Sequence, residues 1–123
     1  MNISKLIRSF GYAFQGIKFA VTLDQNIRFH LVFGFIVLIL SLFLRVSKTE
    51  LLFVIFAIFF VVITEMINTA IEEMTNLILK EHSREAKIAK DVAAGSVLLS
   101  AIFAVIVGLV VLIPHALILI PSL

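Results

Sequence analysis

Four polar side chains at the end of a long apolar run have the types and the spacing that chemistry requires. Glu65, Asn68, Thr69 and Glu72 follow an uncharged stretch that begins at Leu51. At about 100° per residue they fall on one narrow face of a helix. A carboxylate inside a membrane costs on the order of 2.5 to 3.5 kcal/mol, so its presence indicates a functional site.

Two further polar clusters could complete a site for a metal-bound polyphosphate. One cluster is Asp24 with Arg28, and the other is Lys87, Lys90 and Asp91. Mg²⁺ takes one or two carboxylates and fills its remaining positions with phosphate oxygens and water, while lysines balance the remaining phosphate charge. A deep, desolvated carboxylate beside such a site could accept a proton from an alcohol. Together these clusters suggest phosphoryl transfer to a lipid hydroxyl group.

The elements that must position these residues are membrane helices. The chain has 123 residues, of which 62% are hydrophobic and 15% charged, and it has no cysteine. This composition indicates an integral membrane protein without disulfides or thiolate metal sites. We expect a single all-α domain with spans over about 24–44, 51–71 and 92–113, the last ended by Pro114. Residues 1–20 have the periodicity of an amphipathic surface helix and do not resemble a cleavable signal peptide.

The basic residues predict how these spans are oriented. With three spans, the N-terminus and the segment 72–91 lie on one side of the membrane, and the turn at 45–50 lies on the other. The first side holds eight basic residues and the second holds two, which predicts that the first side is cytoplasmic, where ATP is available. The eight are Lys5, Arg8, Lys18, Arg28, Lys80, Arg84, Lys87 and Lys90, and the two are Arg45 and Lys48.

Each cluster also has an interpretation without chemistry. Glu65 and Asn68 could form hydrogen bonds that only hold helices together. Asp24 with Arg28 could be an i,i+4 pair that caps a helix, and the charges of the segment 72–91 could belong to a solvated loop.

Other candidate ligands and motifs give no support for a known nucleotide fold. His30 and His115, near the ends of spans, are expected to lie at the membrane interface and not to bind a ligand. The glycines form neither a P-loop nor a GxGxxG motif, and no protein-kinase signature set is present. A nucleotide site in this chain must therefore differ from those of soluble kinases.

Two motifs resemble a known family. Glu65-x-x-Asn68-x-Ala70-x-Glu72, followed by Ala89-Lys90-Asp91-x-Ala93-Ala94-Gly95, is similar to the bacterial diacylglycerol kinase and undecaprenol kinase family. The resemblance implies a lipid kinase of the bacterial inner membrane that uses ATP and Mg²⁺ at the cytoplasmic face. It also implies a homotrimer with composite sites between subunits, and no nucleic acid partner. The run from Asn26 to His30 is similar to the Gram-positive branch, which implies undecaprenol as acceptor, with diacylglycerol as the alternative.

The resemblance also assigns roles to individual residues. Glu65 matches the catalytic base, and Asp24 and Glu72 match the pair that holds the metal ions bound to ATP. Asp24 stands where the family usually has a glutamate, one methylene longer. Asn68 and Arg28 are expected to support the site. The positions implied to bind nucleotide are Lys5, Tyr12, Asp24, Glu72, Glu81, His82, Ser83, Lys90 and Asp91.

Two rival functions belong to other classes of protein. A small proton-coupled transporter would use Glu65 to bind protons and would not bind nucleotide. A non-catalytic subunit of a membrane assembly would use Glu65 and Asn68 only for helix packing, and it would tolerate apolar replacements of both.

Overall fold

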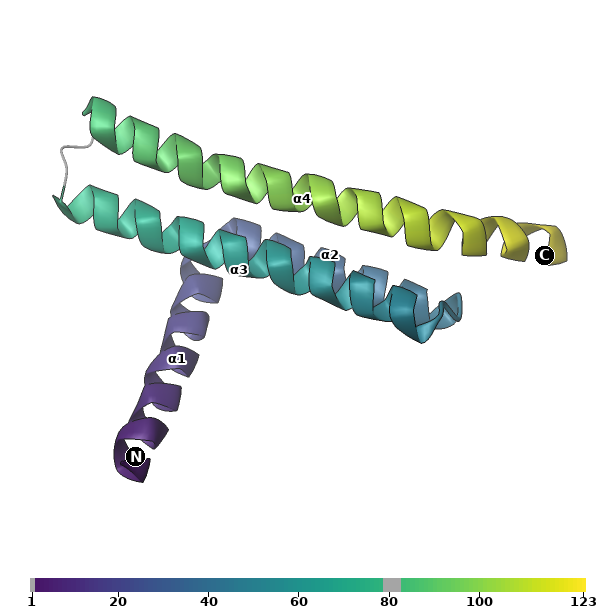
Figure 1. Cartoon of the computed structure of the whole chain (residues 1–123), viewed down its shortest axis with the longest axis horizontal. Helices are drawn as coiled ribbons and strands as arrows, with labels where there is room; N and C mark the ends of the chain where they lie inside the picture. Colours follow the sequence, from purple (N-terminus) through teal and green to yellow (C-terminus); the bar gives the residue numbers. More distant parts are fainter. Residues whose placement is uncertain (1, 79–82) are drawn as a thin grey trace.

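The protein is a bundle of long helices from which one helix projects (Figure 1). The computed structural model describes residues 2–78 and 83–123. Its elements are α1 (Ile3–Leu23), α2 (Gln25–Phe43), α3 (Lys48–Ile78), α4 (Arg84–Leu119) and a short 3₁₀ helix, η1 (Ile120–Ser122). No strand occurs in these two ranges. Three segments, Gln25–Phe43, Lys48–Ile78 and Arg84–Ser122, are long and apolar enough to cross a membrane. The all-α class and the three apolar helices are therefore confirmed.

The central helix is α3, which packs against both α4 and α2 and also touches α1. Small side chains line these interfaces: Ala57 of α3 is buried, as are Ala93 and Ser100 of α4. At Gly34 of α2, an added Cβ atom would lie 2.9 Å from Cγ2 of Ile58, so only glycine allows this approach. Small residues let membrane helices come close, and here they set how α2 lies against α3.

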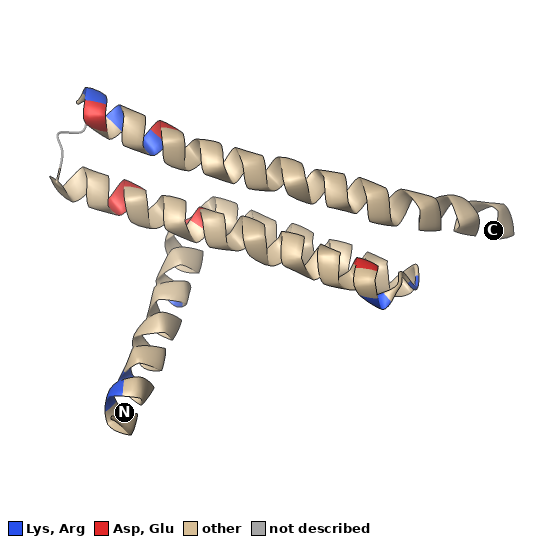
Figure 2. Ribbon diagram, in the orientation of Figure 1, with Lys and Arg blue, Asp and Glu red and all other residues tan. Residues whose placement is uncertain are grey.

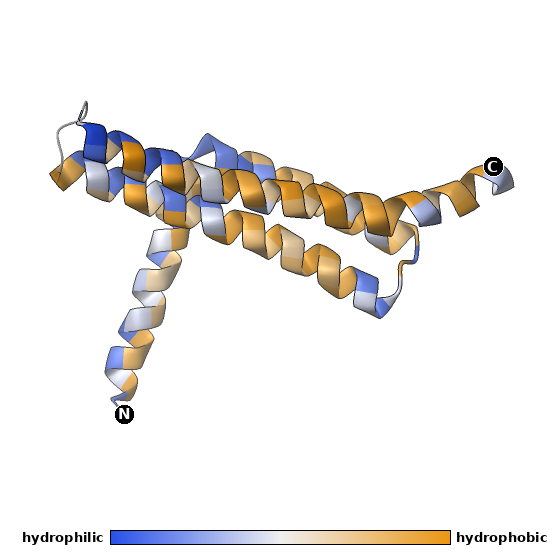
Figure 3. Cartoon of the chain, turned by 45° about the horizontal axis from the view of Figure 1, so that its top comes forward, coloured by the Kyte–Doolittle hydropathy of each residue, from blue (hydrophilic) through white to orange (hydrophobic). Residues whose placement is uncertain are grey.

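Charge and hydropathy divide the bundle along its length. Charged residues gather towards one end of α3 and α4, the end nearest α1 (Figure 2). Beyond them the helices are predominantly apolar up to the turn between α2 and α3 (Figure 3). Large apolar side chains such as Phe35, Phe59 and Leu99 are more than half exposed on the outer faces. This is the pattern of helices that face lipid along their length and water at their ends.

The helix containing the polar stripe, α3, continues past its apolar span to Ile78. One helix boundary, at the end of the last span, differs from the sequence prediction. Pro114 was expected to end the last span, but it lies inside α4, which continues to Leu119. Proline removes one backbone N–H donor. Unwinding the segment after it would leave several more backbone groups unpaired in apolar surroundings, so continuing the helix costs less.

Candidate active site

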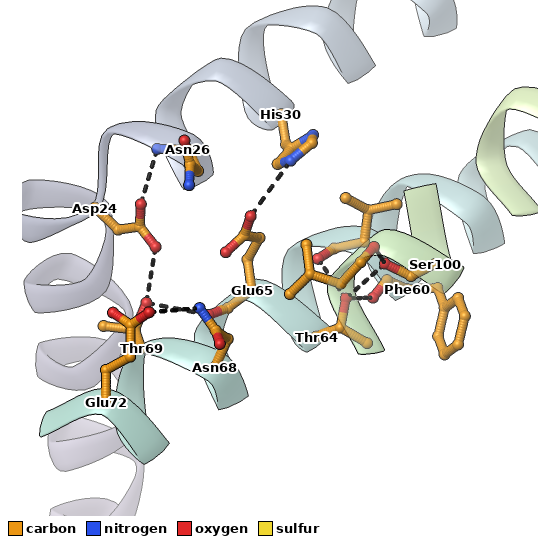
Figure 4. A network of polar contacts seen from close by, with 12 residues as sticks. Asp24, Asn26, His30, Phe60, Thr64, Glu65, Asn68, Thr69, Glu72 and Ser100 are labelled. Atoms are coloured by element: carbon orange, nitrogen blue, oxygen red, sulfur yellow. Dashed lines mark hydrogen bonds and ion pairs between the residues drawn. The ribbon is translucent and has the colours of Figure 1, made fainter. Parts of the chain in front are cut away.

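Asp24 links the start of α2 to α3. It separates α1 from α2 in an extended conformation, and its Oδ1 accepts a hydrogen bond from the backbone N–H of Asn26 at 2.8 Å. Aspartate is a preferred N-cap because it satisfies a free N–H group at the helix start. The second oxygen, Oδ2, accepts a hydrogen bond from the Thr69 hydroxyl at 2.8 Å. Asp24 is thereby fixed beside the polar stripe of α3 (Figure 4).

Glu65 is the buried carboxyl group of the site, with 3% of the residue exposed. Its Oε1 lies 3.5 Å from Nε2 of His30, which comes from α2. Its Oε2 is buried and has no hydrogen-bond partner. A buried acceptor without a partner costs about 1 to 3 kcal/mol, so an oxygen of this kind marks a place where a ligand can bind.

Asn68 and Glu72 continue the stripe by one turn. Nδ2 of Asn68 donates a hydrogen bond to Oε1 of Glu72 at 3.2 Å, while Oδ1 of Asn68 is buried without a partner. One residue before Glu65, the hydroxyl oxygens of Thr64 and Ser100 lie 2.8 Å apart and tie α3 to α4. The site thus contains two unpartnered acceptors held between packed helices (Figure 4).

The carboxylates of the site fit a metal ion that arrives with phosphate. Thr69 donates to Oδ2 of Asp24 and to the backbone carbonyl of Glu65, and Asn68 donates to Glu72, so the three acidic side chains belong to one polar cluster. A divalent cation would balance their negative charges. Within residues 2–78 and 83–123, no three His, Cys, Asp or Glu side chains are grouped closely enough to hold a metal on their own. Two carboxylates completed by phosphate oxygens and water are a typical Mg²⁺ environment. Asp24 and Glu72 therefore suit a metal–nucleotide complex.

Arg28 does not form the pair with Asp24 that its spacing suggested. Its Nη1 donates to the backbone carbonyl oxygens of Val21 at 2.8 Å and Thr22 at 2.7 Å. These carbonyls belong to the last turn of α1, where the helix leaves acceptors unpaired. Arg28 thus fastens the end of α1 to the first turn of α2, and supports the site by fixing the direction in which α1 leaves the bundle.

The third cluster lies at the same end of the bundle but is separate from the first two. Lys87 forms an exposed ion pair with Asp91, one turn later on α4. In the part of the chain that the structure describes, no hydrogen bond or ion pair joins Lys87, Lys90 or Asp91 to Glu65. The structure therefore brings two of the three predicted clusters into contact.

Among the described residues, Lys5, Tyr12 and Ser83 form no hydrogen bond or ion pair with Asp24, Glu65 or Glu72. Lys5 and Tyr12 are exposed on α1, which leaves the bundle at a steep angle (Figure 1). Ser83 is the N-cap of α4, where its hydroxyl accepts a hydrogen bond from the backbone N–H of Ala86 at 3.1 Å. Glu81 and His82 lie outside the described residues.

Sequence reasoning gave no site role to His30 or Thr69, although both contact predicted site residues. Thr69 was placed on the polar face, and its contact with Asp24 depends on how α2 and α3 are aligned. His30 was expected at the membrane interface, yet it faces Glu65. In the sequence, His30 stands three residues after Ile27 and four before Gly34, so the three share one helix face. That this face packs against α3 is shown by the buried Ile27 and by the close approach at Gly34.

Comparisons with known proteins identify the family. The model of the family described as prokaryotic diacylglycerol kinase matches residues 11–112. A diacylglycerol kinase of Synechocystis is 39% identical over 110 residues, which are 89% of this chain and 63% of that protein. An undecaprenol kinase of Bacillus subtilis is 33% identical over 113 residues, 92% of each chain. A diacylglycerol kinase of Escherichia coli is 27% identical over 114 residues, 93% of each chain.

The match to the family model extends over both polar clusters that the fold joins, over α2 and α3, and over α4 as far as residue 112. The chain spans 63% of the length of the Synechocystis relative and more than nine tenths of the other two. The relatives are named as kinases, which is consistent with a lipid kinase. The chain belongs to the prokaryotic diacylglycerol kinase family.

Proposed function

We propose that this protein transfers the γ-phosphate of ATP to the hydroxyl group of undecaprenol at the cytoplasmic face of a bacterial inner membrane. The observation that carries the proposal is the carboxyl group of Glu65, which is buried in the same polar cluster as Asp24 and Glu72 with one oxygen unpartnered. Family membership supports a lipid acceptor and ATP as the phosphate donor. The distribution of basic residues, eight on one side of the membrane and two on the other, supports the cytoplasmic orientation.

In this mechanism Glu65 is the catalytic base. Its free Oε2 accepts the proton of the lipid hydroxyl group. At the same time the hydroxyl oxygen forms a bond to the γ-phosphorus of ATP, and the bond between the γ-phosphorus and the oxygen of the departing ADP breaks. A general base within hydrogen-bond reach of the reacting proton contributes typically about 10²- to 10⁴-fold. Because phosphoryl transfer needs mainly positioning and charge stabilisation, the buried site also serves by holding the hydroxyl group in line.

The charge of the phosphates is balanced by a metal and by lysine. Asp24 and Glu72 would hold Mg²⁺, which when bound with ATP neutralises the phosphate oxygens. Thr69 keeps the Asp24 carboxylate facing α3 through its 2.8 Å hydrogen bond. Lys90 and Asp91, which match the phosphate- and nucleoside-binding pair of the family, lie in the second turn of α4.

We further propose a homotrimer in which neighbouring subunits complete each site. Lys5 and Tyr12 on the projecting α1 do not contact Glu65 of their own chain, so a neighbour's site is the place where they could contact a nucleotide. The many exposed apolar side chains of α2 and α4 leave ample surface for packing against other copies or lipid.

The choice of lipid is tested by offering the two acceptors separately. The named relatives divide between diacylglycerol kinases and an undecaprenol kinase. We expect labelled phosphate to pass from ATP to undecaprenol in Mg²⁺-containing detergent micelles, with slower transfer to diacylglycerol. Faster transfer to diacylglycerol would keep the mechanism and replace the acceptor. A folded protein that binds no nucleotide but conducts protons would favour the transporter.

A further inference from the structure

His30 is held against Glu65 by the packing of α2 on α3. Its Nε2 lies 3.5 Å from Oε1 of Glu65, and 23% of the His30 side chain is exposed. Among the described residues, His30 is the one basic side chain within ion-pair distance of Glu65. This contact joins two helices, so it depends on the rotation of α2 about its own axis.

That rotation is fixed on both sides of His30. Ile27, one turn earlier, is fully buried, and Gly34, one turn later, lies against Ile58 where a Cβ atom would approach Cγ2 to 2.9 Å. Residues three and four apart lie on one face of a helix, so this face of α2 is pressed against α3. The ring of Phe29 packs edge-on against the imidazole, with 5.6 Å between ring centroids. The imidazole is therefore held in place before any substrate binds.

His30 also marks the boundary between apolar and polar surroundings. A groove of about 400 Å³ runs between α2, α3 and α4, and His30 is the single titratable side chain that lines it. The other lining residues, from Phe33 near His30 to Ile113 at the far end, are apolar or glycine. Figure 4 shows the Glu65 carboxyl group between His30 on one side and the Asp24–Thr69 pair on the other.

We propose that His30 is a positioning residue for the catalytic base, an inference that rests on the proposed function. The Nε2–H group of His30 holds Oε1 of Glu65 and so fixes the plane of the carboxyl group. Oε2, which is buried and unpartnered, is then the oxygen that faces the acceptor and takes its proton. The 3.5 Å separation is long for a hydrogen bond, but such contacts commonly tighten when the substrate is bound.

Only one of the two equivalent carboxylate oxygens of Glu65 has to face the hydroxyl group of the acceptor. A carboxyl group at the end of a flexible side chain can rotate, and each rotation away from the acceptor removes the reactive geometry. A misplacement of about 1 Å at a reacting group can cost on the order of 10²-fold in rate. Holding one oxygen from a rigid neighbouring helix leaves the other in a single orientation.

The test replaces His30 with side chains that keep or lose the donor. His30→Gln retains an N–H group near the position of Nε2, whereas His30→Leu removes it at similar size. The matched control is His115→Gln, because His115 forms the same kind of contact with Glu50 at the other end of the bundle. We expect His30→Leu to lower kcat by about 10- to 100-fold, with the Kd for Mg·ATP unchanged. His30→Gln should recover most of the rate, and His115→Gln should match the wild type.

Several results would overturn the assignment. These are an unchanged kcat in His30→Leu, an equal loss in His30→Gln and His30→Leu, or a loss of nucleotide binding together with kcat. If His30→Leu does not fold, as judged by helical circular dichroism, the comparison becomes His30→Gln with the shorter His30→Asn. A turnover rate retained in His30→Gln but lost in His30→Asn supports the proposal, and equal rates in these two variants contradict it. Absence of transfer by the wild type would reject the proposed function itself, which is a different outcome.

Discussion

Each end of the bundle joins a histidine to a glutamate across two helices, but the two contacts are completed differently. Near the turn between α2 and α3, Oε1 of Glu50 accepts a hydrogen bond from the Ser47 backbone N–H at 3.0 Å. Nε2 of His115 lies 3.0 Å from Oε1 and 3.2 Å from Oε2 of the same carboxylate. At the end near α1, Glu65 has only His30 at 3.5 Å, and its Oε2 has no partner.

The difference sets a contact that completes a helix cap apart from the contact to which we assign chemistry. Glu50 caps the start of α3, since its own backbone N–H donates in return to the Ser47 hydroxyl at 3.1 Å, and this reciprocal arrangement is a capping box. Its side chain is about one third exposed, whereas Glu65 is 3% exposed. A carboxylate whose oxygens are satisfied stabilises a helix end. A buried carboxylate with a free oxygen costs stability, and that cost is expected where a ligand completes the group.

The largest effect should come from removing the proton acceptor. Glu65→Gln keeps the size of the side chain but cannot take a proton, so we expect kcat to fall by about 10²- to 10⁴-fold. Binding of Mg·ATP should persist, because Glu65 is assigned to the acceptor and not to the nucleotide. The measurements are steady-state turnover and nucleotide titration in detergent. Turnover within a few-fold of the wild type would remove the base assignment.

Loss of a metal-binding carboxylate should have the next largest effect. Glu72→Ala removes one of the two oxygen donors assigned to Mg²⁺ and also frees Nδ2 of Asn68. We expect the Mg²⁺ concentration for half-maximal activity to rise about tenfold, which corresponds to about 1.4 kcal/mol. A Mg²⁺ titration of activity at fixed ATP measures this. An unaltered titration curve would exclude Glu72 as a ligand.

A smaller effect should follow from releasing Asp24. Thr69→Val keeps the shape of the side chain and removes the hydroxyl group that donates to Oδ2 of Asp24. Hydrogen bonds to charged groups contribute about 1.5 to 3 kcal/mol, but Asp24 is partly exposed and retains its N-cap bond, so the lower end is expected. The Mg²⁺ requirement should rise by less than in Glu72→Ala. Thermal unfolding and the Mg²⁺ titration together separate lost stability from lost metal affinity, and no change in either would contradict the contact.

The smallest effect is expected at the opposite end. His115→Leu removes the contact to Glu50 but leaves the Ser47 capping box in place. A partly exposed ion pair contributes about 0 to 1 kcal/mol, so the midpoint of thermal unfolding should fall slightly and turnover should be unchanged. A loss of turnover comparable to that of His30→Leu would remove the distinction between the two ends.

Patterns within one helix were predictable, and contacts between helices were not. Hydropathy was sufficient for the three long apolar helices, and the helical period placed Glu65, Asn68 and Glu72 on one face. The contacts of His30 with Glu65 and of Thr69 with Asp24 depend on the close approach at Gly34, which no periodicity reveals. Local spacing was even misleading for Arg28, which binds the end of α1 and does not pair with Asp24.

The helix ends show the same limit. The expected break at Pro114 followed from the missing N–H group of proline, but α4 continues because its apolar surroundings penalise unpaired backbone groups more heavily. Such tertiary effects are not encoded in the residues nearest to the boundary.

The central claim is that the end of the bundle with the incomplete carboxylate transfers phosphate from ATP to a lipid. It is tested most directly by incubating the purified protein with γ-labelled ATP, Mg²⁺ and undecaprenol in micelles and following the label. We expect label in the extracted lipid, with transfer at least about 100-fold slower in Glu65→Gln and unchanged in His115→Gln. Folded protein that leaves the label in ATP, or passes it equally well without Glu65, would contradict the account.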